Sequence, residues 1–429
     1  MNILILHRIP YHQIEYHRGI DHARHEVTYF GTAAALATLP AGLRRQEAVR
    51  AGRAGVFEEA KAWLGKAPRH FDRVIALSGH EMLEAAQLRD WLGIPGASEE
   101  QVTRVRHKIR MKQDAARAGL RVPRFQPLTE FLRNRDLPLW RGRTVLKPHG
   151  APAGGEVAVF DTTVAARAAV LGFCSGIARL DAVQHTDACG DFEVEEFVEG
   201  PVLHFDGLVA DGQILALSAS RHVNSRLGYA CGKPLGSLHI PATGAIRRWA
   251  TQALESVGLR EGGFHLEAIE SGDELVFLDI APRAESPDVV AAFELATGIH
   301  LPSHELRILL GEHPGHALNT GACGERWHGW FAVPGHHLGG GAHGGLGGIA
   351  AFRRSDAVLR WNELRAGAML PEAITYQAHE VPLAGIIATA TPAQTQAWME
   401  SLFAALRWEF HTTAHGRAWQ GAEMLQTVT

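Results

Sequence analysis

The sequence predicts a parallel α/β region at the N-terminus, followed by α+β architecture. Short apolar runs at residues 2–6, 25–30 and 74–77 alternate with a helical pattern at 81–92, which is typical of a parallel sheet covered by helices. Farther along, alternating runs are joined by short Gly-containing segments, as in antiparallel hairpins. With 429 residues, the chain has room for roughly two to four such units.

The composition excludes several classes of protein. Lysine plus arginine total 42 and aspartate plus glutamate total 46, so the net charge of −4 gives no reason to expect a nucleic-acid partner. Hydrophobic residues make up 46% and charged residues 21%, which are values of a folded globular chain. Four cysteines without a C-x-x-C pair argue against a disulfide scaffold or a structural zinc site. The apolar run at 2–6 is too short for a signal peptide or a membrane span, so we expect a cytoplasmic protein without a membrane partner.

We expect residues 1–97 to form the first domain. Its predicted helix ends at Gly93-Ile94-Pro95-Gly96, a sequence that breaks helices. No G-x-G-x-x-G follows the first strand, so a dinucleotide site is not expected there. Ligands bind at the carboxyl ends of parallel strands, so one of the residues from His7 to His12 is expected to contact a substrate, with His12 among the candidates.

Residues 98–311 are predicted to form the second domain, and residues 312–429 a C-terminal α+β subdomain. Ser98 is suited to cap a helix that runs through Lys108 to residue 118, with Gly119 at its end. The remaining predictions are strands at 144–148, 156–160 and 192–198, hairpins at 203–219 and 263–280, a helix at 245–257, strands at 358–364 and 385–390, and a helix at 393–406.

Two carboxylates face each other across the second hairpin if residues 272–274 form its loop. In that register Glu267 lies opposite Asp279. Opposed carboxylates about 4 Å apart repel by about 4 kcal/mol at an effective dielectric near 20. A divalent cation turns this cost into a gain, and oxygen ligands suit Mg²⁺ shared with a nucleotide phosphate. The alternative is a solvated hairpin in another register, because a two-residue turn would put the two side chains on opposite faces.

Lys147 lies at the end of a predicted strand, before a loop that contains Gly150, Gly154 and Gly155. A lysine in this position can meet phosphate oxygens while backbone N–H groups close around them. The alternative is a solvent-exposed lysine before a turn at Pro148. The acidic and apolar alternation at 193–199 is equally typical of a half-exposed strand.

The motifs are more specific together than singly. In chain order they are Lys108, Lys147-Pro148 with its glycine loop, Glu195-Glu196-Phe197-Val198-Glu199-Gly200-Pro201, Phe264-His265-Leu266-Glu267 and Asp279-Ile280-Ala281-Pro282-Arg283. This order resembles the ATP-grasp superfamily over roughly residues 1–310, and the opening segment resembles the superfamily's Rossmann-like N-terminal domain. The runs at 7–12 and 204–207 are similar to the L-amino acid ligase branch, whose members make dipeptides, including building blocks of peptide antibiotics.

The resemblance implies an ATP-grasp core over 98–311, with a lid at roughly 144–200 that closes over ATP. Lys108 and Lys147 would contact the phosphates of ATP. The adenine edge would be held by Glu195 together with the backbone of Glu196, Phe197 and Val198.

The resemblance also implies the catalytic and metal-binding roles. Glu267 and Asp279 would bind Mg²⁺, with Mn²⁺ as an alternative ion, and Asp279 would bridge two ions. Arg283 would steady the transferred phosphoryl group and the acyl phosphate, alongside Lys147. Two positions depart from the family pattern, since Val202 replaces a glutamate that contacts ribose and Ala281 replaces an asparagine that binds the second metal.

The function implied is an ADP-forming carboxylate–amine ligase that joins two small amino acids through an acyl phosphate. Two alternatives stay open, namely a ligase or carboxylase with a non-amino-acid partner, and a non-catalytic nucleotide-binding protein. A homodimer is one assembly that the sequence allows.

Histidines offer weaker signals. The residues at 7, 12, 17 and 22 recur every five positions, which turns each by about 140° on a helix, so they do not form a metal site on one face. The glycine-rich run that contains His336, His337 and His343 is predicted to be a mobile loop. Among the substrate candidates, His265 could line the acyl site and Arg221 could meet a phosphate or a substrate carboxylate.

Overall fold

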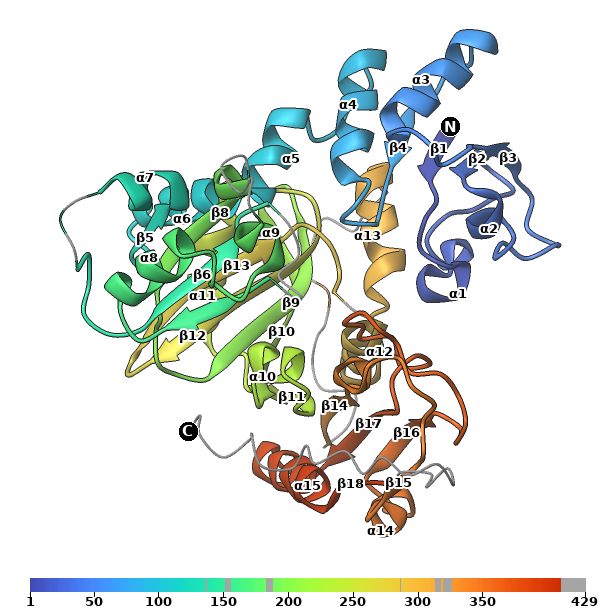
Figure 1. Ribbon diagram of the computed structural model, residues 1–429. Coiled ribbons are helices and arrows are strands. Elements are labelled where there is room, and N and C mark those ends of the chain that lie inside the picture. Colours follow the sequence, from blue (N-terminus) through green and yellow to red (C-terminus); the bar gives the residue numbers. More distant parts are fainter. Residues whose placement is uncertain are drawn as a thin grey trace.

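The computed structural model describes residues 1–134, 136, 138–150, 156–182, 188–285, 287–312, 318 and 326–409. Three principal sheets organise them (Figure 1). Within these ranges no helix is both long and apolar enough to cross a membrane. Gly154 and Gly155, which belong to the predicted glycine loop after Lys147, lie outside the described residues.

The N-terminal sheet is parallel, with strand order β3-β2-β1-β4. Its strands are β1 (Asn2–Leu6), β2 (Glu26–Gly31), β3 (Gln46–Val49) and β4 (Arg73–Ile75). Alternate residues of β1 face opposite sides. Leu4 and Leu6 pack on α3 (Val56–Lys66) and α4 (Met82–Leu92), whereas Ile3 and Ile5 pack toward α13 (Leu301–Leu310). The predicted parallel arrangement is therefore confirmed, and β3 is an additional strand that the sequence did not reveal.

A small antiparallel sheet with order β5-β8-β6-β7 forms the second layer, and we call it the small sheet. It contains β5 (Phe125–Pro127), β6 (Thr144–Pro148), β7 (Ala158–Phe160) and β8 (Phe192–Glu196). Helices α7 (Leu128–Arg133), α8 (Thr163–Leu171) and α9 (Ala178–Asp181) contribute Phe131, Val170 and Leu180 to a hydrophobic cluster with Leu146 and Phe192.

The large sheet has eight antiparallel strands in the order β13-β12-β9-β10-β11-β14-β17-β16. They are β9 (Val202–Ala210), β10 (Gln213–Val223), β11 (Leu235–Ile240), β12 (Gly262–Ser271), β13 (Glu274–Ala281), β14 (Trp327–Val333), β16 (Val358–Glu363) and β17 (Leu383–Thr389). The sheet continues across the predicted boundary at residue 311, so the C-terminal segment extends the sheet of the preceding segment.

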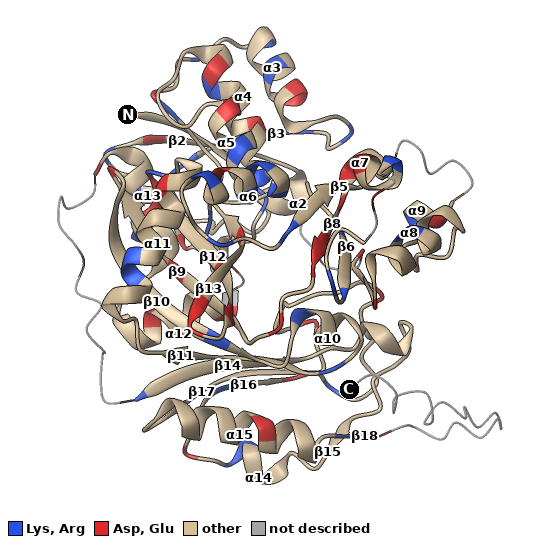
Figure 2. Cartoon of the chain, turned by 90° about the vertical axis from the view of Figure 1, so that its left-hand side faces the viewer, with Lys and Arg blue, Asp and Glu red and all other residues tan. Residues whose placement is uncertain are grey.

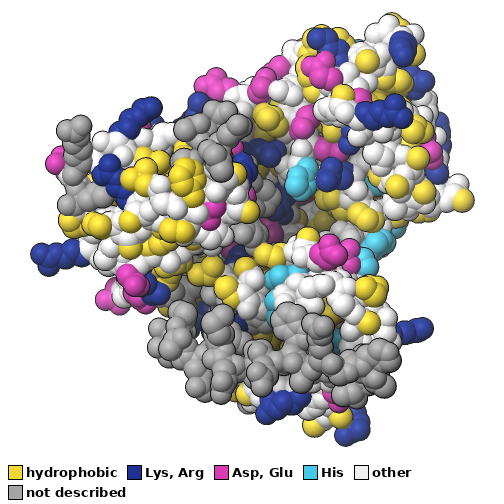
Figure 3. Space-filling view, viewed as in Figure 1, with side chains coloured by type: hydrophobic (Ala, Val, Ile, Leu, Met, Phe, Trp, Pro, Cys, Tyr) yellow, Lys and Arg dark blue, Asp and Glu magenta, His cyan; other side chains and the backbone are white. Residues whose placement is uncertain are grey.

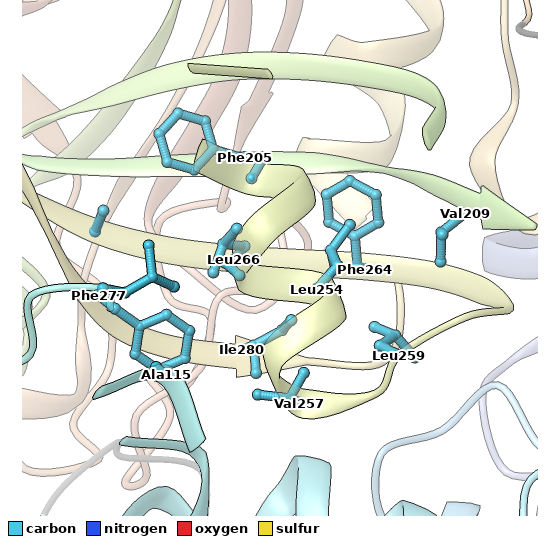
Figure 4. Close-up of a cluster of buried hydrophobic side chains, with 14 of the residues drawn as sticks. Ala115, Phe205, Val209, Leu254, Val257, Leu259, Phe264, Leu266, Phe277 and Ile280 are labelled. Carbon is cyan, nitrogen blue, oxygen red and sulfur yellow. The ribbon is translucent and has the colours of Figure 1, made fainter. Parts of the chain in front are cut away.

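Helices cover both faces of the large sheet. On one face, α6 (Lys108–Arg117) and α11 (Gly244–Val257) bury Ala115, Leu254, Phe264 and Phe277 (Figure 4). On the other, α12 (Pro287–Thr297) and α13 pack on β9, β12 and β14. Helix α15 (Pro392–Ala405) packs on β11, β14 and β17 from the same face as α11, with Met399 in one cluster with Phe331. The remaining short elements are α1 (Tyr11–Ile14), η1 (Tyr16–Arg18), α2 (Ala33–Leu36), α5 (Glu99–Arg106), η2 (Ala188–Asp191), α10 (Arg226–Ala230), η3 (His336–Leu338), β15 (Leu346–Gly347), α14 (Ala350–Arg353) and β18 (Arg407–Trp408).

The predicted single helix from 98 to 118 is wrong in one respect. Ser98 does cap it, through a reciprocal capping box with Gln101. The helix then breaks at His107, which has extended backbone angles, and α6 begins at Lys108. The break places the backbone N–H of Lys108 3.0 Å from the carbonyl oxygen of His149, at the end of β6. A hydrogen bond to the small sheet therefore replaces the continuing helix.

Two further predictions need correction. The strands and the hairpin predicted between 144 and 219 do not belong to one sheet, because β9 and β10 lie in the large sheet and β5 completes the small one. The glycine-rich run predicted to be a mobile loop contains η3 and β15, and His343 is buried there. His336 Nε2 lies 3.0 Å from the carbonyl oxygen of Ala230, so this run contacts the last residue of α10.

Candidate functional site

Ion pairs connect α6 to both the small and the large sheet. Figure 2 shows where the charged residues lie along these elements. Lys108 at the start of α6 forms an ion pair with Asp279 on β13. One turn later, Lys112 contacts Glu193 and Glu195 on β8. The space-filling view shows a hollow in this part of the surface, with basic, acidic and histidine side chains on its wall (Figure 3).

The small sheet presents a buried charge cluster. Lys147 Nζ lies 2.5 Å from Glu195 Oε1, and Lys112 Nζ lies 2.7 Å from Glu195 Oε2 and 2.8 Å from Glu193 Oε1. Burial acts to raise the pKa of Glu195, but the charges of Lys112 and Lys147 outweigh it and lower that pKa. Burial acts in the opposite sense on Lys147, whose pKa is raised by Glu195, Glu193 and, from the large sheet, Asp279. Lys147 therefore stays charged while facing the large sheet.

The predicted adenine-side residues lie at the end of β8. The Glu196 carboxylate accepts a hydrogen bond from Arg124 at 3.0 Å, and the Arg143 guanidinium lies 3.7 Å from the centre of the Phe197 ring. Val198 packs against Ile269 and Val276 of the large sheet. The segment after β8 therefore bridges the two sheets.

The hairpin of β12 and β13 pairs Glu267 directly with Asp279, as predicted. The route differs from the expected one. Ser271 pairs with Glu274, which leaves a two-residue turn, and a β-bulge after Glu267 then adds one residue on β13. A two-residue turn alone would separate the carboxylates, but the bulge restores the pairing.

Positive charge surrounds both carboxylates. Asp279 contacts Lys108, and Arg226 Nε lies 3.1 Å from Glu267 Oε1. Burial acts to raise the pKa of Glu267, but Arg226 and contacts with His222 and His265 lower it well below the ordinary value. Within the described residues, Glu267 Oε1 is a buried oxygen without a hydrogen-bond partner. Two paired carboxyl groups, one with an oxygen that forms no hydrogen bond, offer the oxygen ligands that a hard divalent cation prefers.

Beneath Glu267, a buried polar network runs across the large sheet. His265 Nδ1 lies 2.8 Å from Asp206 Oδ1, and His204 Nδ1 lies 2.6 Å from Asp206 Oδ2. The other nitrogen of His204 meets Ser237 Oγ at 2.6 Å. His265 Nε2 faces Glu267 Oε1 at 3.5 Å. Asp206 therefore orients the predicted His265 toward Glu267 of the carboxylate pair.

A second charged group lies where β13 ends. Arg283 Nη1 lies 2.7 Å from Glu285 Oε2, and Arg226 Nη2 lies 3.8 Å from Glu285 Oε1. A Cβ on Gly79, in the segment after β4, would come within 2.8 Å of Arg283 Nε, so a side chain there would displace the guanidinium. Arg226 also lies 6.0 Å from the centre of the Tyr376 ring, which comes from the C-terminal segment.

Two predicted substrate residues are not brought to the carboxylate pair. Arg221 pairs with Glu270 at 2.7 Å, and by strand register it shares a sheet face with Leu203 and Ala268, opposite to the face of Glu267. His12 is exposed on α1.

Sequence reasoning missed Lys112, Glu193, Arg226 and Asp206 as members of the site. Lys112 is four residues after Lys108, so helical spacing could have indicated a second inward lysine. Arg226 follows a strand end without a motif, and no local signal could have found it.

Comparison with known proteins identifies the fold. The sequence matches no family model and no curated protein. Solved structures, in contrast, match nearly the whole chain, and they are ATP-grasp proteins. The chain therefore has the ATP-grasp fold, as the order of its motifs predicts.

Particular structures can be compared in detail. L-amino acid ligase from Bacillus licheniformis has 18% identity and a TM-score of 0.67, with 95% of this chain and 98% of that chain covered. Carboxyaminoimidazole ribonucleotide synthase from Aspergillus clavatus, complexed with ATP, has 13% identity and a TM-score of 0.64, with 94% and 97% covered. Phosphoribosylglycinamide synthetase from Anaerococcus prevotii has 12% identity and a TM-score of 0.59, with 95% and 98% covered.

Proposed function

We propose that this protein is an ATP-dependent, ADP-forming ligase that joins the carboxylate of one small amino acid to the amine of another. The observation that carries the proposal is the ion pair of Lys108, at the start of α6, with the Glu267–Asp279 pair of the large sheet, close enough to Lys147 of the small sheet for the charge of Asp279 to act on it. Two carboxylates opposite a buried lysine suit a nucleotide phosphate with its cation. Similar folds have been solved with ATP and with ADP, which supports nucleotide binding.

In this proposal the small sheet is the lid, and the large sheet with the N-terminal domain forms the rest of the cleft. Lys108 and Lys147 bind the phosphates of ATP. The segment from Glu195 to Val198 lies along the edge of the adenine ring. Glu267 and Asp279 would hold Mg²⁺, which neutralises phosphate charge when bound. Arg283 faces the transferred phosphoryl group, with Glu285 orienting its guanidinium.

The chemistry takes two displacements. A carboxylate oxygen of the first amino acid bonds to the γ-phosphorus, and the bond from phosphorus to the bridging oxygen breaks, which releases ADP. The amine nitrogen of the second amino acid then bonds to the carbonyl carbon, phosphate departs, and the nitrogen loses a proton. Positioning and charge neutralisation account for the catalysis, and no covalent enzyme intermediate is needed.

A second candidate is a ligase that acts on a phosphorylated, non-amino-acid partner. Burial, together with the charges of Arg8, Arg106 and Arg283, lowers the pKa of His80, so three cations lie near the carboxyl end of β4. Such a group would suit an anion. One similar structure holds an aminoimidazole ribonucleotide as well as ADP.

ADP release in the presence of Mg²⁺ separates the two candidates. We expect release to depend on pairs of amino acids, with a dipeptide detected by mass spectrometry. Release that requires a phosphorylated amine, without response to any amino-acid pair, would favour the second candidate. ATP binding without turnover under all these conditions would favour a non-catalytic nucleotide-binding protein.

A further inference from the structure

A small cavity lies directly beside Arg283 and Glu285, at the carboxyl edge of the N-terminal sheet. Its volume is about 40 Å³. Most of its lining is apolar, with Gln13, Glu285 and Glu305 as the polar members; the apolar ones are Ile9, Ile14, Leu77, Ala284, Val290 and Pro302. Leu77 follows β4 and Ile9 follows β1, so the cavity occupies the edge at which parallel sheets bind ligands. On the same measure, one water needs about 10–15 Å³, so the cavity has room for about three or four non-hydrogen atoms.

Charged groups are arranged at one side of this apolar space. Glu285 lines the cavity and pairs with Arg283 at 2.7 Å. An α-amino acid carries its ammonium group and its carboxylate on one carbon. A carboxylate held beside Arg283 would therefore bring the ammonium group to Glu285, and the side chain would point toward the apolar lining.

Glu305 also lines the cavity, but it is suited to a different task. Its carboxylate accepts hydrogen bonds from the backbone N–H groups of Gly263 and Ala284, and burial raises its pKa to about 7. Its hydrogen-bond partners are thus backbone groups of the protein itself. Near neutral pH only a fraction of the Glu305 side chains is ionised. Glu285 pairs with the side chains of Arg283 and Arg226. A substrate ammonium group could replace one of these arginines as its partner.

We infer that this cavity is the side-chain pocket of the carboxylate-donating amino acid, with Glu285 as the partner of its ammonium group, and that the donor is a small α-amino acid. The inference rests on the proposed function and adds to it the class of donor. Side chains up to the size of valine or leucine fit, whereas those of phenylalanine, tyrosine and tryptophan do not.

The products test this directly, because the donor becomes the N-terminal residue of the dipeptide. The enzyme would receive ATP, Mg²⁺ and a mixture of amino acids with graded side chains, and tandem mass spectrometry would give the residue order. We expect small residues at the first position and a wider range at the second. Dipeptides that begin freely with phenylalanine or tryptophan would overturn the inference while leaving the proposed function intact. Absence of any ligated product would remove both.

Enlarging the pocket should change the donor. Ile14→Ala removes part of its wall, so kcat/KM for phenylalanine as donor should rise at least about tenfold relative to the original protein. Ile20→Ala is the matched control, because Ile20 is buried in the same hydrophobic cluster without lining the cavity. An equal gain in both variants, or in neither although both fold, would contradict the placement of the pocket.

Glu285→Gln tests the ammonium contact. The KM for the donor should rise by about tenfold or more, because a charge-assisted hydrogen bond is lost. The KM for ATP should not follow it. A donor that lacks the α-ammonium group, such as propionate, should be used equally poorly by both proteins. An unchanged donor KM in a folded Glu285→Gln variant would exclude Glu285 from the site. If the variant does not fold, the order of the two residues in the dipeptides made by the original protein still tests the inference.

Discussion

Two lysines share the Glu195 carboxylate, and their surroundings give them different tasks. Lys112 is completely buried and touches both Glu193 and Glu195. Lys147 touches Glu195 alone and feels the charge of Asp279 across the cleft. Loss of Lys112 leaves two buried carboxylates without their common partner, whereas loss of Lys147 leaves Glu195 paired with Lys112. Substitution of Lys112 should therefore lower the stability of the protein, whereas substitution of Lys147 should lower its activity.

Lys147→Ala should lower ATP turnover by at least about 100-fold, since removal of one preorganised charge contact has this effect on transition-state stabilisation. The protein should stay folded, because Lys112 still pairs with Glu195. Phosphate release and circular dichroism check the two parts. Near-normal phosphate release by the folded variant would contradict the role of Lys147.

Lys112→Met should lower the free energy of unfolding by about 3–5 kcal/mol, the usual cost of removing one partner of a buried ion pair. Urea unfolding measures it. Lys66→Met is the control, because Lys66 is exposed on α3 and should change stability by no more than about 0.5 kcal/mol. Equal stability of the two variants would show that Lys112 is not needed for the small sheet.

At the scale of elements, one irregularity in a hairpin positions the carboxylate pair. The bulge between β12 and β13 brings Glu267 opposite Asp279, and Lys108 and Arg226 approach them from α6 and α10. Another element, the segment between β8 and β9, depends on Gly200. This glycine has φ 146°, and a Cβ there would lie 2.0 Å from the carbonyl oxygen of Glu270. Only glycine allows this crossing from the small sheet to the large one.

Asp279→Asn should reduce the rate more than Glu267→Gln if Asp279 bridges two ions, because charge is then lost at both. The rate of each variant as a function of Mg²⁺ concentration measures the difference. Excess Mg²⁺ should restore the rate of the Glu267→Gln variant more fully than the rate of the Asp279→Asn variant. A nearly unaffected Asp279→Asn variant would exclude a metal-binding role for this hairpin.

The small sheet should become protected when ATP binds, since lids of this kind close over their ligand. Its contacts to α6 and to His107, which precedes this helix, include the Lys112 ion pairs and the stacked rings of His107 and His149, whose centres are 4.3 Å apart. Hydrogen exchange with and without ATP should show slower exchange in peptides from 144–200 that contain Lys147 or Glu195. Unchanged exchange there, with ATP binding shown independently, would argue against a lid.

At the scale of the whole molecule, α13 holds the N-terminal sheet to the large sheet. Leu306 and Leu310 pack with Ile3 and Ile5 of β1, whereas Leu301 and Ile308 pack with β9 and β10. Between these two rows, Glu305 accepts the backbone N–H groups of Gly263 and Ala284. One helix thus fixes the relation between the sheet edge that carries the donor pocket and the strands that carry the carboxylate pair.

The contribution of Glu305, at this junction, to the stability of the protein should depend on pH. Burial raises the pKa of Glu305 from 4.5 to about 7, so the folded protein binds a proton there that the unfolded chain has lost. Stability should therefore fall as pH rises from about 4.5 to 7. The fall from this group is at most about 3 kcal/mol, and Glu305→Gln should remove it. Urea unfolding of both proteins from pH 5 to 8 tests this, with the exposed Glu255→Gln as control. Parallel curves for the original protein and Glu305→Gln would contradict it.

The sequence by itself determined the order of the motifs and the local elements. Periodicity predicts β1, β2 and β4, and Lys108, Lys147, Glu267, Asp279 and Arg283 follow from their spacing and resemblance. Periodicity reports which face of an element is buried, so it succeeds where burial is one-sided. It misses β3, because three of its four residues are exposed and no apolar pattern marks them.

Only the tertiary structure decided which charges meet. Arg226 reaches Glu267 from a helix that no motif marks, and Lys112 reaches β8 across more than eighty residues of chain. The pairing of Glu267 with Asp279 depends on a bulge that the turn sequence does not encode. Arg221 had the residue type and strand position of a substrate contact, yet its sheet face points the other way. Side-chain contacts of this kind depend on the strand register and on the packing between distant segments. Local sequence patterns do not encode either of them.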